Sequence, residues 1–425
     1  MIALGGAGLA AFALLGAPLF TVIAAIALWG FWEEEINAAA FIIELYRMTD
    51  APTLLAIPFF TFAGFLMAEA GTPGRLTRLA RAALGWMPGG LALVTLATCA
   101  FFTAFSGASG VTIVALGGLL FAALTQDGYS ERFSLGLVTT GGGLGLLFPP
   151  SLPLILYGVV AGVNIDHLFI AGVVPGLLLI LILSIYCMKI ASTEAPRTPF
   201  SYPEFSAALK EAGWELPLPA IILGGIYGGI YTPAEASVVA AVYVLIVEVW
   251  VFHDLDLWDE VPNITKESMI LVGVILVILG ASLGLTNYLV DQQVPQRILE
   301  AVRSFSTSRY AFLLALNLFL LAVGCMMDIF SAIVVVVPLI VPIAKEFGIH
   351  PVHLGIIFLA NLEIGYITPP VGLNLFIASN RFGKPLSEIW RTTLPFLILR
   401  LGALALITYF SGLSLAPLRW LTGAP

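Results

Sequence analysis

Long apolar runs without a charged side chain alternate with short charged segments along nearly the whole chain. A membrane-spanning helix needs about 20 apolar residues, and most of the runs approach or exceed this length. They cover 1–32, 51–68, 82–126, 133–165, 168–188, 216–234, 268–290, 311–327, 329–344 and 392–399. The pattern predicts a series of membrane-spanning helices. We expect 1–32 to be the first span and not a signal peptide, because it has no basic leader and is too long for a signal core.

Two of the apolar stretches are interrupted by polar residues. The run 82–126 is too long for one span and holds Ser106, Ser109 and two glycines at its centre. It forms either two full spans with a turn outside the membrane or a re-entrant hairpin whose tip lies inside it. The small, uncharged tip favours the hairpin, because irregular backbone at membrane depth must lie in a protein interior or line a cavity. Gly324–Ser331 interrupts 311–344 about 220 residues later and is the matching feature.

A short motif occurs twice at one spacing. A glycine followed by two adjacent prolines recurs 220 residues further on, and a later proline recurs at the same offset. The matching positions are Gly145 and Gly365, Pro149 and Pro369, Pro150 and Pro370, and Pro175 and Pro395. Adjacent prolines break helices. A helix broken at corresponding places in two halves of a chain is typical of a transporter's binding site.

A basic segment precedes each interrupted stretch. Arg75, Arg78 and Arg81 share one helix face in the first, and Arg297 and Arg303 match two of them at an offset of 222. We expect each segment to be an amphipathic arm helix at the membrane interface. The alternative for one of them is a topological anchor.

These features together predict an all-α polytopic membrane protein with two structural repeats. Each repeat has an arm helix, a re-entrant helical hairpin and a helix broken at a Pro-Pro pair. The predicted divisions are scaffold helices at 1–72, a first repeat at 73–190 with its break at 145–151, a loop and central scaffold helices at 191–267, a second repeat at 268–413 with its break at 365–371, and a tail at 414–425.

Composition narrows the class further. Hydrophobic residues make up 60% of the 425-residue chain and charged residues 10%, whereas soluble domains carry about 25% charged residues. Cys99, Cys187 and Cys325 lie in apolar runs and are expected to be packing residues. His350 and His353 are the only histidines close enough to suggest a ligand pair, and they flank a proline, so we expect no metal site there.

Several strings resemble one known family: Pro52-Thr-Leu-Leu-Ala-Ile-Pro58-Phe-Phe, Ala100-Phe-Phe-Thr-Ala-Phe-Ser106-Gly, Phe148-Pro-Pro-Ser-Leu-Pro, Tyr231-Thr-Pro-Ala-Glu235-Ala and Ile364-Gly-Tyr-Ile-Thr368-Pro-Pro-Val-Gly372. Together they resemble the large membrane subunit of tripartite ATP-independent periplasmic (TRAP) transporters of the dicarboxylate/sialic acid type. The resemblance covers nearly the whole chain. It implies inverted repeats, an elevator mechanism, sodium coupling, a small four-helix membrane subunit and a periplasmic substrate-binding protein, in the bacterial cytoplasmic membrane.

The resemblance also implies two or more sodium ions. Backbone carbonyls at helix breaks and nearby hydroxyls supply the oxygens that bind such ions in transporters. The candidates are Thr103, Ser106, Gly145, Phe148 and Pro150 in the first repeat, and Gly324, Gly365, Thr368 and Val371 in the second. Thr103 and Phe148 stand where the family pattern has serine and a smaller aliphatic residue. Threonine keeps the hydroxyl, and Phe148 would act through its carbonyl. The alternative for these residues is close helix packing.

Asp328 is the sharpest single candidate, because a carboxylate at membrane depth is costly and usually functional. It either acts on a cation or substrate or caps a helix. We predict a substrate site formed by Asp328, Asn374 and Ser109. Glu363 is expected to brace the second break, Asn361 to bind substrate or satisfy freed backbone groups, and Glu235 to cap a helix after Thr232-Pro233.

The predicted function is sodium-coupled uptake of small organic anions delivered by a binding protein. No lysine lies near either break and no arginine is closer than Arg381, so helix N-termini and bound sodium are expected to supply the positive potential. The chain carries no Walker-type loop and no converging set of titratable groups, so neither an ATPase nor another enzyme is predicted, and no nucleic-acid partner is expected. A stand-alone transporter of a related elevator group is the alternative.

Overall fold

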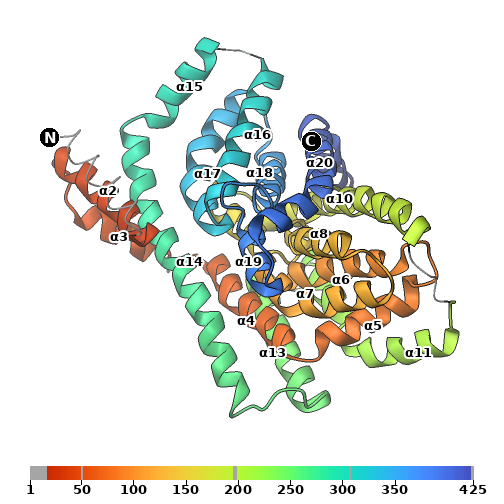
Figure 1. The fold of residues 1–425 in the computed structure, drawn as a ribbon. Coiled ribbons are helices and arrows are strands. Elements are labelled where there is room, and N and C mark those ends of the chain that lie inside the picture. Colours follow the sequence, from red (N-terminus) through yellow and green to blue (C-terminus); the bar gives the residue numbers. More distant parts are fainter. Residues whose placement is uncertain (1–16, 49–50, 195–198, 306–307, 423–425) are drawn as a thin grey trace.

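The structure, a computed structural model, describes residues 17–48, 51–194, 199–305 and 308–422. These residues form helices and no strand (Figure 1), which confirms the predicted all-α class. The first half contains α2 (Leu19–Glu33), α3 (Ala39–Arg47), η2 (Pro52–Leu55), α4 (Ala56–Glu69), α5 (Thr72–Leu84), α6 (Gly90–Ser106), α7 (Ser109–Gln126), α8 (Glu131–Gly141), η3 (Leu144–Leu147), α9 (Leu152–Ala161), α10 (Ile165–Glu194) and α11 (Tyr202–Glu211).

The second half continues the all-helical pattern after a short turn. It contains η4 (Ala212–Trp214), α12 (Pro217–Tyr227), α13 (Pro233–Ile246), η5 (Val247–Val251), α14 (Glu260–Asp291), α15 (Val294–Phe305), α16 (Arg309–Met326), α17 (Ile329–Glu346), α18 (Pro351–Gly365), α19 (Leu373–Phe382), α20 (Leu386–Tyr409) and α21 (Gly412–Thr422). The start of α13 is capped as predicted, because Thr232 and Glu235 form a reciprocal capping box.

Eight helical segments among the described residues are long and apolar enough to cross a membrane, which confirms a polytopic membrane protein. The helices on either side of the first Pro-Pro pair, bent by 44°, would make a ninth span. Of the first predicted span, 1–32, the structure describes only residues from 17 onward, where α2 forms. The segment expected as a tail from 414 lies mostly in α21, and residues 423–425 are outside the described part.

One group of helices surrounds the long helix α14. It packs against α2, α3 and α4, and α4 in turn packs against α13; α2 and α3 lie on its outer side in Figure 1. Glycines on α14 permit this contact: a Cβ at Gly284 would overlap the ring of Phe41, and one at Gly280 would overlap Leu45. Small residues are the usual means of close helix approach in membranes. We call α2, α3, α4, α13 and α14 the frame; the predicted second repeat begins at 268, inside α14.

The first arm helix forms as predicted, but its basic face binds protein carboxylates. Arg75 of α5 is buried and pairs with Glu215, Glu248 and Asp254. Burial lowers the pKa of the Arg75 guanidinium, but the hydrogen bonds that it donates to Asp254 and Glu215 outweigh burial and raise the pKa overall. The predicted interfacial position of this face is therefore wrong at Arg75, because three acids far away in sequence cover it.

The other two arginines of this arm pair with acids as well. Arg78 bonds to Glu204 at 2.8 Å and to Glu211, both on α11. Arg81 bonds to Asp127, at the end of α7, at 2.9 Å. The arm thus connects the frame side of the chain to the base of the first hairpin.

Two helical hairpins occur where the polar interruptions predict their tips. Gly107 and Ala108 join α6 to α7, and Gly107 has a φ of +65°. Met327 and Asp328 join α16 to α17. We call α6 to α10 and α16 to α21 the hairpin unit; Figure 1 shows it beside the frame, with α4 and α14 nearest to it.

Candidate ion and substrate site

The first break lies between α8 and α9 and packs against the first hairpin. Gly145 belongs to the turn η3 and packs against α6. A Cβ at Gly145 would come closer than 3.0 Å to backbone atoms of Ala100 and Ala104. Glycine at this position therefore allows the break and the hairpin to touch through their backbones.

An oxygen cluster joins the first hairpin to this break. The Thr103 hydroxyl lies 2.7 Å from the carbonyl oxygen of Cys99, 2.8 Å from that of Gly142 and 2.8 Å from the Thr112 hydroxyl. The Ser106 hydroxyl lies 3.5 Å from that of Thr112. Four oxygens meet at this point: the hydroxyls of Thr103 and Thr112 and the two carbonyls. Each hydroxyl has one hydrogen to donate, so two hydrogens are shared among four oxygens. Such a donor set fits a small cation that prefers neutral oxygens.

The structure brings together some, but not all, of the residues predicted for the first ion site. Thr103, Ser106 and Gly145 lie at the contact just described. Phe148 lies past the turn, and its ring packs against α10, where a Cβ at Gly176 would be 2.8 Å from it. Pro150 is buried at the break itself.

Two further residues of this cluster escaped the sequence analysis. Thr112 lies one turn after the hairpin tip, and Gly142 contributes only a carbonyl. In the sequence, only its position three residues after Ser109 connects Thr112 with the hairpin tip.

The second break repeats the backbone contact of the first. A Cβ at Gly365 would lie closer than 3.0 Å to the backbone of Gly324, and one at Gly324 would lie 2.9 Å from the Cα of Leu362. Beyond the break, the Gly372 N–H donates to the carbonyl of Cys325 at 3.0 Å. The predicted pair Gly324 and Gly365 is therefore in direct contact.

The two breaks differ in how far they are covered. Pro149 and Pro150 are buried, whereas Pro369 and Pro370 are exposed. Thr368 is half-buried and donates to the carbonyl of Ile364 at 2.8 Å. Val371 is 40% exposed. The first candidate ion site is enclosed, and the second is open on one side.

Asp328 caps a helix and also lines a cavity. Its carboxylate accepts from the backbone N–H groups of Phe330 and Ser331, both at 3.0 Å, and from the Ser331 hydroxyl. The neighbouring N–H of Ile329 donates to the hydroxyl of Tyr366, from the second break. The capping interpretation of Asp328 is confirmed, and the capped tip is held by the break.

Ser109 and Asn374 meet across the two halves of the chain. The Ser109 hydroxyl donates to the side-chain oxygen of Asn374 at 2.8 Å, and both residues are almost fully buried. Ser109 begins α7 at the first hairpin tip, and Asn374 begins α19 after the second break. Two of the three predicted substrate residues are therefore in contact although 265 positions separate them.

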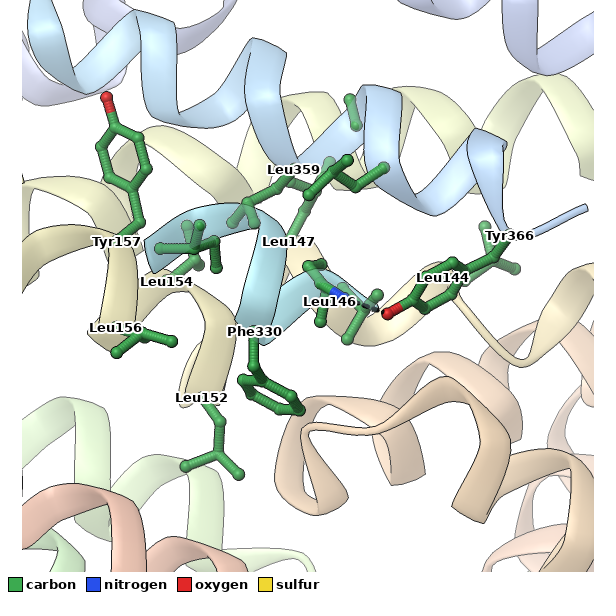
Figure 2. Close-up of a cluster of buried hydrophobic side chains, with 14 of the residues drawn as sticks. Leu144, Leu146, Leu147, Leu152, Leu154, Leu156, Tyr157, Phe330, Leu359 and Tyr366 are labelled. Atoms are coloured by element: carbon green, nitrogen blue, oxygen red, sulfur yellow. Dashed lines mark hydrogen bonds between the residues drawn. The ribbon is translucent and has the colours of Figure 1, made fainter. Parts of the chain in front are cut away.

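A cavity of about 740 Å³ lies between the frame and the hairpin unit, and Ser109 and Asp328 both line it. Its volume is within the range of small-molecule sites. The frame contributes residues of α4 and α14, including Phe65, Ile275 and Ile278. The hairpin unit contributes both hairpin tips, Leu146 of η3 and one face of α19. Figure 2 shows Leu144 and Leu146 of η3 in the same buried cluster as Phe330 and Tyr366.

Arg381 is the cation of this cavity, and the sequence analysis placed it too far from the breaks. Leu373, Ile377 and Arg381 follow one another at helical spacing on α19, so all three face the cavity. Arg381 forms no hydrogen bond or ion pair with another described residue, and its guanidinium lies over α7 at Gly118. The other charged residues of the lining are Asp328 and Glu69. An unpaired arginine in the wall of this cavity can bind the carboxylate of a small organic anion.

The two breaks are also braced against each other. Arg400 of α20 pairs with Glu363 at 3.0 Å and donates to the carbonyl of Thr140, next to the first break, at 2.8 Å. Both charged side chains are 1% exposed. Asn361, the other flanking candidate, donates to the side chain of Asn317 in the second hairpin at 2.6 Å. Glu363 thus has the bracing position we expected, and Asn361 supports the hairpin.

Comparison with known proteins decides the family. Residues 7–413 match the family described as "Tripartite ATP-independent periplasmic transporter, DctM component". The C4-dicarboxylate TRAP transporter large permease protein DctM of Pseudomonas aeruginosa is 41% identical over 381 residues, which are 89% of each chain. This chain belongs to the DctM family of TRAP transporters. It is a membrane transporter subunit and not an enzyme, as the sequence predicted.

Other relatives of this TRAP permease differ in the substrates that their names give. The ectoine/5-hydroxyectoine large permease protein UehC of Ruegeria pomeroyi is 33% identical over 95% of both chains. The isethionate TRAP transporter permease protein DctMQ of Oleidesulfovibrio alaskensis is 38% identical over 86% of this chain and 58% of its own. Among solved structures, the YdaH transporter of Alcanivorax borkumensis has a TM-score of 0.60 at 13% identity, covering 88% of this chain and 87% of its own. That likeness supports the fold.

Proposed function

We propose that this permease carries small organic anions, C4-dicarboxylates in the first place, in a TRAP transporter driven by sodium. The observation that carries the proposal is the cavity between the frame and the hairpin unit, which is lined by Arg381, by Ser109 of the Ser109–Asn374 contact and by both hairpin tips. The Pseudomonas aeruginosa relative is named a C4-dicarboxylate permease. A carboxylate can take charge-assisted hydrogen bonds from Arg381.

The partners follow from the family. A tripartite transporter has three components, and the DctM family supplies one of them. We infer that this chain works with a small four-helix membrane subunit and with a soluble binding protein that delivers the substrate. The binding protein lies in the periplasm, so the membrane is the bacterial cytoplasmic membrane.

Sodium would act at the contacts between hairpins and breaks. At the first contact, the oxygen cluster around Thr103 would supply neutral oxygens. At the second contact, Thr368 and the backbone around Gly324 and Gly365 would supply them. A bound cation would hold each hairpin tip against its break and so complete the cavity wall. The hairpin unit with its cargo would then slide along the frame, which is an elevator mechanism.

The connections of the helices support inverted repeats. Arg81–Asp127 and Lys384–Glu131 link the base of the first hairpin with the end of α19 at one end of the hairpin unit. The Tyr157 hydroxyl donates to the carbonyl of Pro351 at 2.8 Å, at the end where the second hairpin opens. The two hairpins would therefore enter the membrane from opposite faces.

The charge distribution supports one orientation. A group of cations lies at the base of the first hairpin or on the helices that meet there: Arg75, Arg78, Arg81, Arg132, Lys189, Lys384 and Arg391. Lysine and arginine are in excess on cytoplasmic segments. We infer that the first hairpin opens to the cytoplasm and the second to the periplasm.

Thermal unfolding of the purified protein in NaCl and in choline chloride at equal ionic strength tests sodium binding. A ligand of the native state alone stabilises it by about 2.7 kcal/mol at 100 times its Kd. We expect a higher midpoint in NaCl and loss of this difference in the variant Ser106→Ala/Thr368→Ala. The control is Thr125→Ala/Thr265→Ala, which removes two hydroxyls bonded within their own helices, one at the base of the first hairpin and one on α14. Equal midpoints in the two salts would contradict the sodium sites.

Uptake by the reconstituted three-component system tests the substrate site. Replacing Arg381 by glutamine removes the cavity's cation, and we expect the apparent KM for a C4-dicarboxylate to rise about tenfold, equivalent to about 1.4 kcal/mol. Lys210→Gln on α11 is the matched loss of charge outside the cavity. Full uptake without a binding protein would favour the stand-alone alternative.

A further inference from the structure

A second large cavity lies within the hairpin unit, apart from the substrate site. It has a volume of about 920 Å³ and is lined by residues of α8, α10 and α20. These three helices lie side by side in Figure 1, and α20 contacts both others. None of its lining residues belongs to the frame or to either hairpin tip.

The rim of this cavity is positively charged. Arg132, Lys189 and Arg391 line it, one from each of the three helices, and Glu388 is the acid among the lining residues. Glu388 lies 4.0 Å from Lys384. Arg132 and Arg391 are exposed and have no ion pair or hydrogen bond with any residue that the structure describes. The cavity therefore presents more positive than negative charge, with two arginines available to a ligand.

Two helix N-termini add to this potential. Ser130, the cap residue of α8, and Pro385, the cap residue of α20, both line the cavity. The N-terminus of a helix carries a partial positive charge and free N–H groups, and anions bind there readily. Both helices have more than two turns, so their ends strengthen an anion site formed by the arginines.

The floor of the cavity is aromatic. Phe133, Tyr186 and Phe396 line it and pack on one another, with ring centroids 5.8 Å apart for Phe133 and Phe396 and 5.2 Å apart for Tyr186 and Phe396. An inorganic anion would occupy only the rim and leave this floor uncovered. A ligand with an anionic head and an apolar part matches both regions.

The cavity also lies at the ends of two predicted spans. Lys189 is next to the last residue of the span Ile165–Ile190, and Pro385 directly precedes the span Leu386–Tyr409. This is the depth at which phospholipid phosphates lie, and basic pockets between membrane helices bind anionic head groups. We propose that this cavity binds an anionic phospholipid, with its phosphate at Arg132 and Arg391 and its acyl part on the floor formed by Phe133, Tyr186 and Phe396.

Native mass spectrometry of the purified chain tests the proposal. The protein is incubated with phosphatidylglycerol or with phosphatidylcholine of the same acyl chains, and the retained lipid is counted. We expect phosphatidylglycerol to be retained at least fivefold more. Arg132→Gln/Arg391→Gln should abolish the preference and leave the unfolding midpoint in phosphatidylcholine unchanged, because neither arginine bonds to another described residue.

Two controls separate the alternatives. Lys210→Gln/Lys266→Gln removes the same charge from exposed positions outside the cavity and should retain the preference. If it loses the preference equally, or if the two lipids bind alike, the proposal is overturned. Inorganic phosphate at millimolar concentration should not displace phosphatidylglycerol; complete displacement would assign the site to a free anion and overturn the lipid assignment.

Discussion

Gly145 and Gly402 show how differently the same residue type acts at two positions. Gly145 lies where a Cβ would overlap the backbone of α6, whereas a Cβ at Gly402 in α20 would meet nothing within 4 Å. We expect Gly145→Ala to destabilise the protein by about 1–3 kcal/mol, the usual effect of overpacking. Gly402→Ala should leave stability unchanged or raise it by up to about 1 kcal/mol, because alanine favours helix. Unfolding of both variants in detergent checks this, and equal stability of the two would contradict the contact.

At Asp328, capping and charge can be separated by substitution. Asparagine caps helices about as well as aspartate, whereas alanine does not. Asp328→Ala should therefore lower the free energy of unfolding by about 1 kcal/mol, and Asp328→Asn should retain it. Thermal unfolding of the two variants is the measurement. An equally large loss in both would show that the charge, and not the cap, stabilises the second hairpin tip.

Among the elements, the two broken helices are linked by the buried pair Glu363–Arg400. Removing one partner of such a pair costs about 3–5 kcal/mol, whereas replacing both by apolar residues is often neutral. We expect Arg400→Met to destabilise strongly and Arg400→Met/Glu363→Leu to recover most of the loss. Denaturant unfolding of the single and double variants measures the coupling. If the double variant were as unstable as the single one, the pair would not be the link between the breaks.

The whole molecule has a testable topology. In the proposed inverted arrangement, Gln126 at the base of the first hairpin and Lys345 at the base of the second lie on opposite membrane faces; both are exposed. The native cysteines Cys99, Cys187 and Cys325 are buried and provide a low background. We expect an impermeant maleimide outside the cell to label Lys345→Cys and not Gln126→Cys. Labelling of both from the same face would contradict inverted repeats.

The sequence predicted the local features of this molecule better than its long-range pairings. Proline pairs, apolar runs and the polar interruptions depend on neighbouring residues, and they placed both breaks and both hairpin tips. Ser109 and Asn374 were each predicted for the substrate site, but their contact depends on how the two halves pack. Arg381 was set aside because it lies far along the chain from the breaks, yet two helical turns of α19 bring it to the cavity.

Buried charge was the hardest feature to predict. Arg75 of the first arm gave no sign of its partners Glu215, Glu248 and Asp254, which are 140 or more positions away along the chain. Arg400 lies at the end of an apolar run and gave no sign of its partner Glu363. In both cases a charge in a nearly apolar chain has few possible partners, and only the fold shows which one it meets.

The division of the substrate cavity between two bodies has a consequence for inhibition. In the proposed mechanism a cargo must travel with the hairpin unit, so it can bond to Arg381 and the Ser109–Asn374 pair but must release α4 and α14. A molecule that keeps these contacts and also carries an apolar group long enough to pack on Phe65 and Ile275 would join the moving wall to the stationary one. Such a compound would be a non-transported blocker, and lengthening the apolar group of a substrate should convert it from cargo into inhibitor.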